Sequence, residues 1–551
     1  MNYDYIIVGA GSAGCVLANR LSAMPGRRVL LLEAGPSDWN PLIHMPAGIA
    51  RLAKSRRLNW NYLTEPQAAL GGRRLWWPRG RTLGGSSAIN AMCYVRGVPG
   101  DYDRWAEAIG DPRWSWHEVL PWFLHSEDNS RGTGELHAVG GPLGVSDLRH
   151  HNPLSAALID AAVDAGHARN DDFNGPTQAG FGLYQVTQRN GARCSTATGF
   201  LDPVRQRPNL QVRTHALVEQ ILFDGDRAVG VQLRHGRYRR EQIEAGEIVL
   251  AGGAINSPQL LMLSGIGPAA HLRALGIDVV ADLPGVGGNL QDHLDICTLD
   301  GCRQPVTYDQ LNELAAGWRW LRHRDGPGSS NVAEAGGFVR SALAEDERCD
   351  LQFHFVPALL DDHGRHRLAG RGYTLHACQL HPRSRGQLTL RSADPAQPPA
   401  IHPSYLSDPE GHDLKRMILA ARLSREILDQ KAFDEYRGEP VFPERRLQTD
   451  AEYAEFIRRK AETIYHPVGT CRMGRDVEAV VDSEFRVHGI RGLRVVDASV
   501  MPCLPTGNTN APTIMLAERA ADLMLRPLSP GDGAAANEAV SRLPQSGTPP
   551  S

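Results

Sequence analysis

The sequence predicts an α/β protein that joins a Rossmann-like dinucleotide-binding domain to a second, α+β domain with a largely antiparallel sheet. A strand at Tyr3–Val8, a glycine-rich turn, a helix at Ala13–Ser22 and a strand at Arg28–Glu33 form one βαβ unit with a parallel strand pair. In the region Gly301–Gln448, Pro and Gly separate alternating stretches such as Gln387–Arg391. That texture is typical of antiparallel strands.

Further strands continue the first domain after a long insertion. They are predicted at Val212–Thr214, Val218–Phe223, Ala228–Arg234, Glu247–Ala251 and Leu493–Val496. The first domain is therefore discontinuous, and its segments are residues 1–160, 212–300 and 460–526. The second domain comprises residues 161–211 and 301–459. Residues 527–551 consist mostly of Pro, Gly, Ser and Ala, which predicts a disordered tail.

The composition excludes several classes of protein. The 551 residues carry 59 Lys and Arg against 62 Asp and Glu, a net charge of −3, which provides no cationic field for nucleic acid. Nine cysteines without a Cys-x-x-Cys spacing disfavour a disulfide framework and a zinc ribbon and predict a reducing, cytoplasmic location. No apolar run approaches the roughly 18–20 residues of a membrane span, and a glycine motif stands where a signal peptide needs its apolar core.

Residues Gly9 to Gly14 form a G-x-G-x-x-G motif between the first strand and the first helix. Gly9 allows the tight turn, Gly11 lets the backbone approach a pyrophosphate, and Gly14 lets the helix pack on the strand. Glu33 follows 19 residues after Gly14, where a carboxylate accepts hydrogen bonds from a ribose diol. The motif predicts a dinucleotide site and does not distinguish NAD from FAD.

A second glycine-rich stretch runs from Arg79 to Asn90 (RGRTLGGSSAIN). Its arginines, glycines and helix-start amides suit a diphosphate and a ring system, although by itself an ordinary surface turn explains it equally well. The segment Gly253–Gly267 is predicted as a strand exit followed by a helix, which is architecture rather than chemistry. His466 precedes a proline, which favours an extended segment from which the side chain can project.

Together these stretches resemble the glucose-methanol-choline (GMC) oxidoreductase family, flavoproteins that oxidise alcohols with FAD. PRGRTLGGSSAIN and GAINSPQLLMLSGIG are similar to its two signature segments, and HPVGTCRMG, VVDASVMP and NTNAPT are similar to its C-terminal half. The resemblance runs in order from Tyr3 to about Leu525. The runs NPLIHMPAGI, GFGLYQVTQ and ETIYHPVGTCRMG look most like bacterial choline dehydrogenases and, closer still, the aliphatic alcohol dehydrogenases of alkane-degrading bacteria.

The resemblance implies that His466 is the catalytic histidine and Asn510 its partner, a position that is His or Asn in different members. Alcohol oxidation removes the hydroxyl proton and transfers a hydride from carbon. An imidazole with an ordinary pKa of about 6.5 can accept that proton at neutral pH. Because a neutral amide cannot, Asn510 is expected to donate a hydrogen bond to the developing alkoxide.

The cofactor implied by the resemblance is FAD, held noncovalently, because Ile89 stands where some members attach the flavin through a histidine. Further contacts are implied along the isoalloxazine ring at Asn90, Ala91 and Met92, at the adenine at Val218, and beside the ribityl chain and ring at Asp497, Ala498 and Asn508. The glycine-rich segments and the second strand supply the other implied contacts: Gly9, Gly11, Ser12, Ala13, Gly14, Glu33, Ala34, Arg81, Leu83, Gly84 and Gly85.

Three other segments have open assignments. Glu334 resembles the substrate-binding acid of choline-oxidising members, and a structural ion-pair partner explains it equally well. Asp361–His366 lacks a recognised ligand pattern, so a solvated loop is predicted there and no metal site. Pro41–Leu58 interleaves apolar residues with Arg and Lys, a pattern that can contact an anionic membrane surface, although a loop lining the active-site entrance is the favoured interpretation.

The sequence therefore predicts FAD-dependent oxidation of a primary, aliphatic alcohol to the aldehyde, with electrons passed to a quinone or other acceptor. Choline dehydrogenase and an FAD-containing lyase of the same family stay open as alternatives. A flavin-binding protein without catalysis is disfavoured by His466 and Asn510. A cytoplasmic location is expected, with or without contact to the inner face of the membrane, and the sequence does not determine the oligomeric state.

Overall fold

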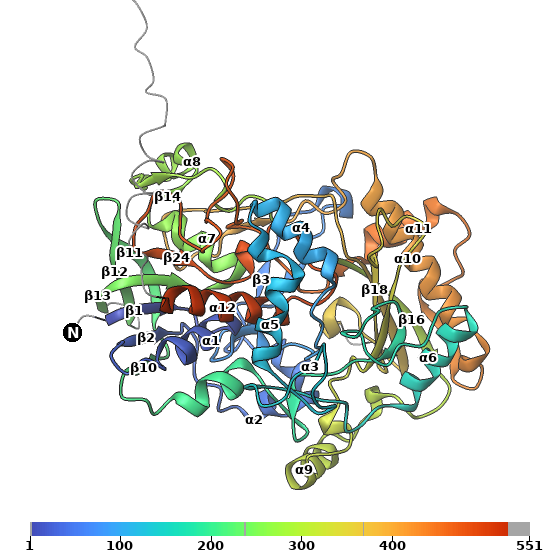
Figure 1. The fold of residues 1–551 in the computed structure, drawn as a ribbon. Coiled ribbons are helices and arrows are strands. Elements are labelled where there is room, and N and C mark those ends of the chain that lie inside the picture. The colour runs from blue at the N-terminus through green and yellow to red at the C-terminus, as the bar shows by residue number, and fades with distance from the viewer. Residues whose placement is uncertain (1–2, 236–238, 367, 527–551) are drawn as a thin grey trace, which may run out of the picture.

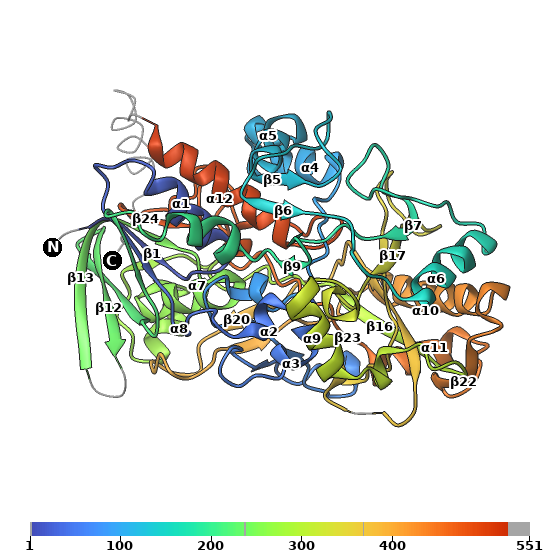
Figure 2. The ribbon, with the colours of Figure 1, turned by 90° about the horizontal axis from the view of Figure 1, so that it is seen from below.

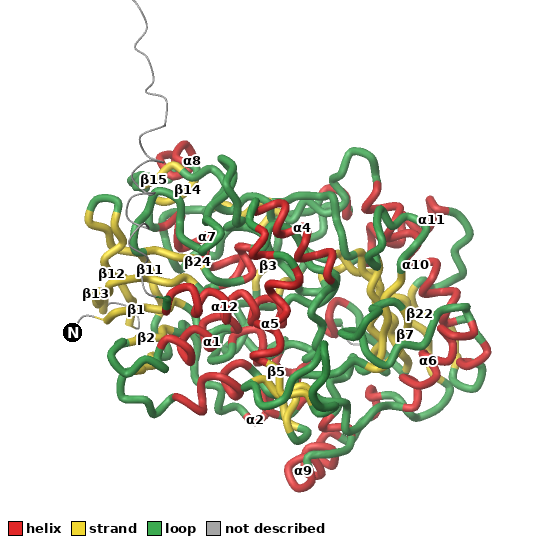
Figure 3. The backbone as a smooth tube through the Cα atoms, viewed as in Figure 1, coloured by secondary structure: helices red, strands yellow, loops and turns green. Residues whose placement is uncertain are grey.

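The computed structural model describes residues 3–235, 239–366 and 368–526. Within these ranges, two seven-stranded sheets lie side by side, the first at the left of Figure 1 and the second at the right. Loops run through much of the region between them (Figure 3). The tail predicted at residues 527–551 lies outside the described residues.

The first sheet is built around the predicted βαβ unit. β1 (Tyr3–Val8) lies between β2 (Val29–Leu32) and β13 (Arg239–Leu250), and the three strands are parallel. The remaining strands are β10 (Leu210–Arg213) and β24 (Leu493–Val495), both parallel to their neighbours, and the antiparallel β11 (Leu217–Asp224) and β12 (Arg227–His235). β13 begins eight residues earlier than predicted, because its first half pairs with β12 in a hairpin.

Helices α1 (Ser12–Leu21) and α12 (Asn510–Leu525) pack side by side on this sheet (Figure 1). A Cβ at Gly14 would lie 1.8 Å from the carbonyl oxygen of Gly9, so only glycine lets α1 start this close to β1. Other helices of this half of the molecule are α4 (Pro99–Ile109), α5 (Trp116–Ser126), α7 (Gly253–Leu263) and α8 (Ala269–Ala274).

The second sheet is antiparallel at every pairing, as predicted. Its order is β22 (Arg437–Phe442), β16 (Leu294–Cys302), β19 (Gly372–Gln379), β18 (Leu351–Val356), β17 (Ala335–Val339) and β7 (Gly180–Leu183), with β23 (Glu462–Thr463) also on β16. Helix α10 (His412–Leu428) covers one face, where Arg425 pairs with Asp300 at 2.6 Å. Helices α6 (Pro153–Asp164) and α11 (Asp450–Lys460) flank it.

The remaining strands form separate two-stranded pairs: β3 (Tyr62–Leu63) with β4 (Trp76–Trp77), β5 (Glu127–Asn129) with β6 (Leu143–Val145), β8 (Gln188–Arg189) with β9 (Ala192–Arg193), β14 (Ile266–Gly267) with β15 (Ala281–Asp282), and β20 (Gln387–Thr389) with β21 (Ala400–His402). The alternating stretch Gln387–Arg391 is therefore outside the large antiparallel sheet, because β20 finds its partner in a local hairpin-like pair.

The domain limits remain a prediction. β16 begins at Leu294 and β23 covers Glu462–Thr463, so both strands of the second sheet start within ranges that the sequence assigns to the first domain. The two halves are joined closely at these points. None of the described helices combines the length and the hydropathy needed to cross a membrane.

Candidate active site

A large cavity is lined by residues of both sheets. Its volume is about 1580 Å³, which exceeds the usual range of small-molecule sites. The glycine turn of β1 and Glu33 line one part of it, and His354, His376 and His466 line another. These dimensions suit a dinucleotide together with a small substrate.

Gly11 is the position at which the chain leaves room for a ligand. A Cβ at Gly9 would lie 2.5 Å from the oxygen of Ala251, and one at Gly85 would lie 2.6 Å from Cα of Gly11, so the fold requires both glycines. A Cβ at Gly11 would meet its nearest atoms only at 4.0 Å, and φ is −79° there. Protein packing therefore does not require glycine at position 11, which lines the cavity. The absence of a side chain there leaves room for a ligand in the cavity.

Two helix N-termini meet beside Gly11. Ser12 begins α1 and Asn510 begins α12, both residues line the cavity, and Ser12 Oγ donates a hydrogen bond to Asn510 Oδ1 at 2.7 Å. Helix N-termini carry unpaired amides and a partial positive charge. The pair of helices therefore forms an anion site that suits a diphosphate.

Glu33 is held at the wall of the cavity by two backbone amides. Its carboxylate accepts hydrogen bonds from Ala10 N at 3.0 Å and from Gly35 N at 2.8 Å. Burial raises the pKa of this carboxyl to about 7. Each carboxylate oxygen keeps a further lone pair, which matches the hydroxyl donors of a ribose diol.

His466 lies in the loop after β23, and two consecutive residues hold it. Its backbone amide donates to Asp292 Oδ1 at 2.7 Å, and its Nδ1 lies 3.0 Å from Nδ1 of His293. Nε2 of His293 lies 3.0 Å from the carbonyl oxygen of Leu380. The loop that carries His466 is thus fixed at both its backbone and its ring.

These contacts determine which ring nitrogens carry protons. Because the Leu380 carbonyl only accepts, Nε2 of His293 must carry a proton, and its Nδ1 accepts from Nδ1 of His466. Burial lowers the pKa of His293 to about 4. Burial and the neighbouring His293 hold the pKa of His466 well below its usual value. Both rings are therefore neutral at neutral pH, and Nε2 of His466 carries no proton and acts as a hydrogen-bond acceptor.

The amide beside His466 belongs to Asn508. Its Nδ2 lies 3.2 Å from Nε2 of His466, and its Oδ1 accepts from Nε2 of Gln352 at 3.0 Å, which sets the orientation of the amide. Asn510 instead bonds to Ser12 at the start of α12. The structure therefore places Asn508, and not Asn510, in hydrogen-bond range of His466, because the chain turns into a helix between the two asparagines.

Comparisons with known proteins identify the family. Residues 3–295 match the N-terminal model of the GMC oxidoreductases, and residues 382–517 match the C-terminal model. The chain belongs to the GMC oxidoreductase family. It is 51% identical to an alcohol dehydrogenase (acceptor) of Pseudomonas putida, over 95% of this chain and 96% of the relative. It is 46% identical to an oxygen-dependent choline dehydrogenase of Pseudomonas fluorescens, over 94% and 93%.

Solved structures agree with this assignment. The fold is similar to pyridoxine 4-oxidase from Mesorbium loti, with a TM-score of 0.86, 35% identity, and coverage of 95% of this chain and 99% of the other. A formate oxidase from Aspergillus oryzae, solved to study FAD modification, gives a TM-score of 0.89 with 26% identity, over 95% and 98%. FAD is the cofactor of this GMC oxidoreductase, and the space at Gly11, the paired helix N-termini and Glu33 fit it.

Most of the predicted cofactor residues of this GMC oxidoreductase line the cavity: Gly9, Gly11, Ser12, Ala13, Glu33, Ala34, Arg81, Gly85, Asn90, Ala91, Met92, Val218, Asp497, Ala498 and Asn508. Gly14, Leu83 and Gly84 are outside the cavity wall. Gly14 packs α1 on β1, Leu83 is fully buried in the core, and Gly84 N donates to Ala10 O at 2.8 Å. These three residues support the wall from behind instead of contacting its interior.

Glu334 also lies outside the cavity wall. It is fully buried, and one of its oxygens accepts from Asn152 N at 2.7 Å and from Ser155 Oγ at 2.6 Å. The other oxygen accepts from the hydroxyls of Tyr308 and Ser330. All four donors come from the protein, so this geometry favours the structural alternative for Glu334 over the substrate-binding one. The carboxylate joins chain segments together.

Sequence reasoning missed three residues that shape the site. Asp292 and His293 clamp His466, and their only signal in the sequence was a pair of adjacent titratable residues before a buried strand. Arg193 is buried and donates to the carbonyl oxygens of Ser87 at 3.1 Å and Asn90 at 2.7 Å. It therefore fixes the backbone that leads into the predicted flavin-contact segment.

The loop Asp361–His366 was predicted to be solvated, but it contributes to the cavity wall. His363, Gly364 and His366 line the cavity, and the Tyr465 hydroxyl contacts Nδ1 of His363. The loop is drawn inward because the His363 ring packs against Trp76 and Tyr465.

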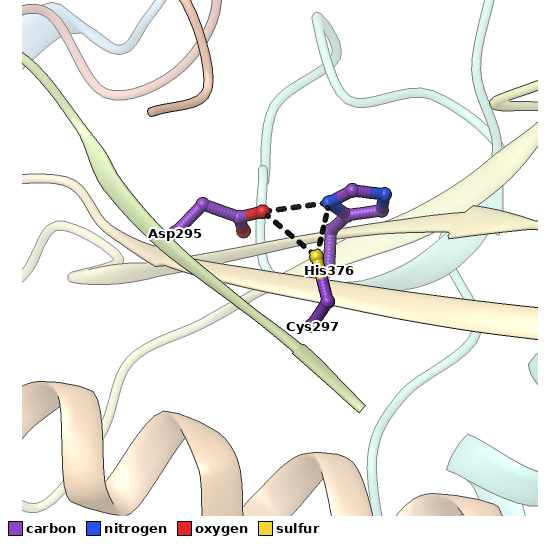
Figure 4. A group of neighbouring side chains, drawn as sticks. All are labelled: Asp295, Cys297 and His376. Carbon is purple, nitrogen blue, oxygen red and sulfur yellow. Dashed lines mark hydrogen bonds and ion pairs between the residues drawn. The ribbon is translucent and has the colours of Figure 1, made fainter. Parts of the chain in front are cut away.

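A buried polar triad lies beside the cavity (Figure 4). Among the described residues it is the group of His, Cys and carboxylate atoms that lie near enough to consider a metal. Nδ1 of His376 is 2.6 Å from Asp295 Oδ2 and 3.1 Å from Cys297 Sγ. Nitrogen and oxygen ligands of a tetrahedral zinc ion would stand roughly 3.3 Å apart. The shorter distance identifies a direct hydrogen bond, and burial raises the pKa of the thiol well above its usual value.

Proposed function

We propose that this GMC oxidoreductase oxidises a primary aliphatic alcohol to the aldehyde and passes the electrons to a quinone or other acceptor. The observation that carries the proposal is the neutral His466 ring, whose proton-free Nε2 lies 3.2 Å from the Asn508 amide at the cavity wall. That pair combines a proton acceptor with a hydrogen-bond donor, the two groups that a carbinol needs. The similarity to an alcohol dehydrogenase (acceptor) supports the same reaction.

The residues have distinct roles in this proposal. Nε2 of His466 accepts the hydroxyl proton of the alcohol, because the other nitrogen of the ring is already protonated. When the alcohol hydroxyl replaces Asn508 as the donor to Nε2 of His466, the Asn508 amide donates to the substrate oxygen and stabilises the negative charge that develops there. His293 acts as a positioning residue that keeps the His466 ring in the required tautomer. Bound at Gly11, the helix N-termini and Glu33, FAD would supply the hydride acceptor for the carbinol carbon and would make the two electrons available to the acceptor.

The proposed mode of cofactor binding is noncovalent. Ile89 is 7% exposed and lines the cavity, and its hydrocarbon side chain cannot form a bond to a flavin. Acid precipitation should release yellow FAD into the supernatant. Colour that stays with the precipitated protein would contradict noncovalent binding.

The aliphatic substrate is supported by the cavity wall. One hydrophobic cluster contributes several cavity-lining side chains: Ala91, Val332, Ala333, Val356, Ala358, Leu360 and Ile464. Each methylene buried against such a wall is worth roughly 0.8 kcal/mol. The efficiency kcat/KM should therefore rise from ethanol toward medium-chain alcohols until the pocket is filled.

Choline is the second candidate, because a choline dehydrogenase is 46% identical to this chain. The position of Glu334 disfavours choline as the substrate. Its carboxylate already accepts hydrogen bonds from protein donors and lies outside the cavity wall. An anaerobic panel of linear alcohols, aromatic alcohols and choline, scored by flavin bleaching, separates the candidates. A higher kcat/KM for choline than for every linear alcohol would overturn the aliphatic assignment, and a flavin that no substrate bleaches would favour a lyase.

A further inference from the structure

Helix α9 (Glu313–His323) has an apolar face that the protein does not cover. Leu314, Trp318 and Leu321 follow one another at positions i, i+4 and i+7, which places them on one side of the helix. Their exposed fractions are 87%, 68% and 57%. Large apolar side chains exposed as a contiguous row indicate a surface that binds another apolar phase.

The opposite side of α9 anchors the helix to the protein. Ala316 and Trp320 are buried, and Nε1 of Trp320 donates to the carbonyl oxygen of Gly191 at 2.7 Å. The helix is therefore apolar on two faces, and the face with Ala316 and Trp320 packs on the protein. Among the described residues, the exposed row stays largely uncovered.

The exposed row lies at the opening of the cavity. Leu314, Trp318 and Leu321 are both solvent-exposed and part of the cavity wall. Across from them, α2 (Pro41–His44) and α3 (Ile49–Leu52) also line the cavity. Figure 2 shows α2, α3 and α9 together on one face of the molecule, and α9 projects from that face in Figure 1.

Cations surround this opening. Arg51 of α3 forms an ion pair with Glu313 at the start of α9, which ties the two elements together. Four further exposed basic residues of these segments have no carboxylate in ion-pair range among the described residues: Lys54, Arg56, Arg57 and Arg322. The face therefore combines an apolar row with unpaired positive charge.

We propose that this face, formed by α9 and the segment Pro41–Arg57, docks on an anionic phospholipid bilayer. Leu and Trp side chains enter the boundary between headgroups and acyl chains, and Lys and Arg bind the lipid phosphates. A second copy of the chain is disfavoured as the occupant, because three side chains are far from the roughly 800 Å² per partner of a stable dimer and the cations of two copies would repel. The inference rests on the proposed function in one respect: it names the surface through which a lipid-soluble quinone and alcohol reach the cavity.

Binding of the FAD-loaded enzyme to vesicles tests the proposal without any turnover. Vesicles of mixed phosphatidylglycerol and phosphatidylcholine should bind the protein more tightly than vesicles of phosphatidylcholine alone, and added salt should weaken the binding. Combined Leu314→Gln, Trp318→Gln and Leu321→Gln should weaken it by 10²-fold or more, on the order expected for three apolar side chains. Val477→Gln is the matched control, because Val477 is 81% exposed and outside the cavity wall.

Two further measurements separate a loss of membrane contact from a loss of folding. Quenching of tryptophan fluorescence by brominated lipid should occur in the wild type and decrease in Trp318→Phe, which retains vesicle binding. The triple variant should keep its FAD content and its thermal stability, which shows that it is folded. Equal vesicle binding by the wild type and the triple variant would overturn the proposal, as would dimers in the wild type that the triple substitution disrupts. A protein that binds vesicles but oxidises no alcohol would contradict the proposed function alone.

Discussion

The Nδ1 atoms of His466 and His293 lie 3.0 Å apart, although the residues are 173 positions apart in the chain. Only one of these two Nδ1 atoms can donate a hydrogen bond to the other. Because Nε2 of His293 donates to the Leu380 carbonyl, the donor is Nδ1 of His466. The result is a directed chain of hydrogen bonds that leaves Nε2 of His466 without a proton, and this nitrogen accepts from Nδ2 of Asn508 at 3.2 Å. The geometry of the second sheet therefore sets the protonation state of the candidate base.

Replacing the candidate base tests its role directly. His466→Ala should retain FAD and slow anaerobic flavin reduction by roughly 10² to 10⁴-fold, the usual value of a positioned proton acceptor. Since the pKa of His466 is lowered, the wild-type rate should fall only as the pH drops below about 6.5. Stopped-flow reduction across a pH series measures both effects, and a wild-type rate in the variant would remove His466 from this role.

His293 is expected to act through the His466 tautomer. His293→Phe removes the acceptor for Nδ1 of His466 and should slow flavin reduction by roughly 10 to 10²-fold. Because His293 lowers the pKa of His466, its loss should also move the acid limb of the pH profile to higher pH. His293→Asn keeps an oxygen acceptor and should restore most of the rate. An unchanged pH profile in His293→Phe would argue for a purely structural role.

The two asparagines near the start of α12 should behave differently. Asn508→Ala removes the donor beside His466 and should lower the rate of flavin reduction by on the order of 10² to 10³-fold. Asn510→Ala removes only the contact with Ser12 and should leave that rate within about tenfold of the wild type. Single-turnover kinetics at equal FAD loading compare them. The reverse ranking would support the role that the resemblance assigns to Asn510.

Gly11→Val should yield protein without bound flavin, because the branched side chain would occupy the space left beside the helix N-termini. The flavin absorbance of purified protein measures this loss. Gly26→Val is the matched control, since a Cβ at Gly26 would meet nothing within 4 Å and the residue lies in the turn between α1 and β2. Colourless protein in both variants would mean that folding, and not the cofactor space, is at fault.

FAD affinity should depend on pH through Glu33. The pKa of this carboxyl is raised to about 7, and a ribose diol donates hydrogen bonds to the ionised form, so FAD selects the deprotonated carboxylate. Lowering the pH from about 8 to about 6 should therefore raise the dissociation constant of FAD about tenfold. Glu33→Gln should bind more weakly with no such dependence. Equal slopes in both proteins would show that another group titrates.

The sequence by itself determined the features that short chain segments encode. Three glycines at fixed spacing, a helix and an acid at the end of the next strand predicted the first half of the cofactor site. The structure places Gly9, Gly11 and Glu33 at the cavity wall as expected. Such features are predictable because hydrogen bonds and packing within about thirty consecutive residues determine them.

The tertiary structure decided what depends on segments far apart in the chain. The resemblance implied that Asn510 is the partner of His466 and Asn508 a flavin contact, and only the start of α12 directs Asn510 to Ser12. Glu334 resembled a substrate ligand until the fold surrounded it with four donors. His293 carried no recognisable motif, because its function comes from a contact across two loops of the second sheet. The positions of these three side chains follow from contacts between segments far apart in the chain, which the pattern of neighbouring residues does not encode.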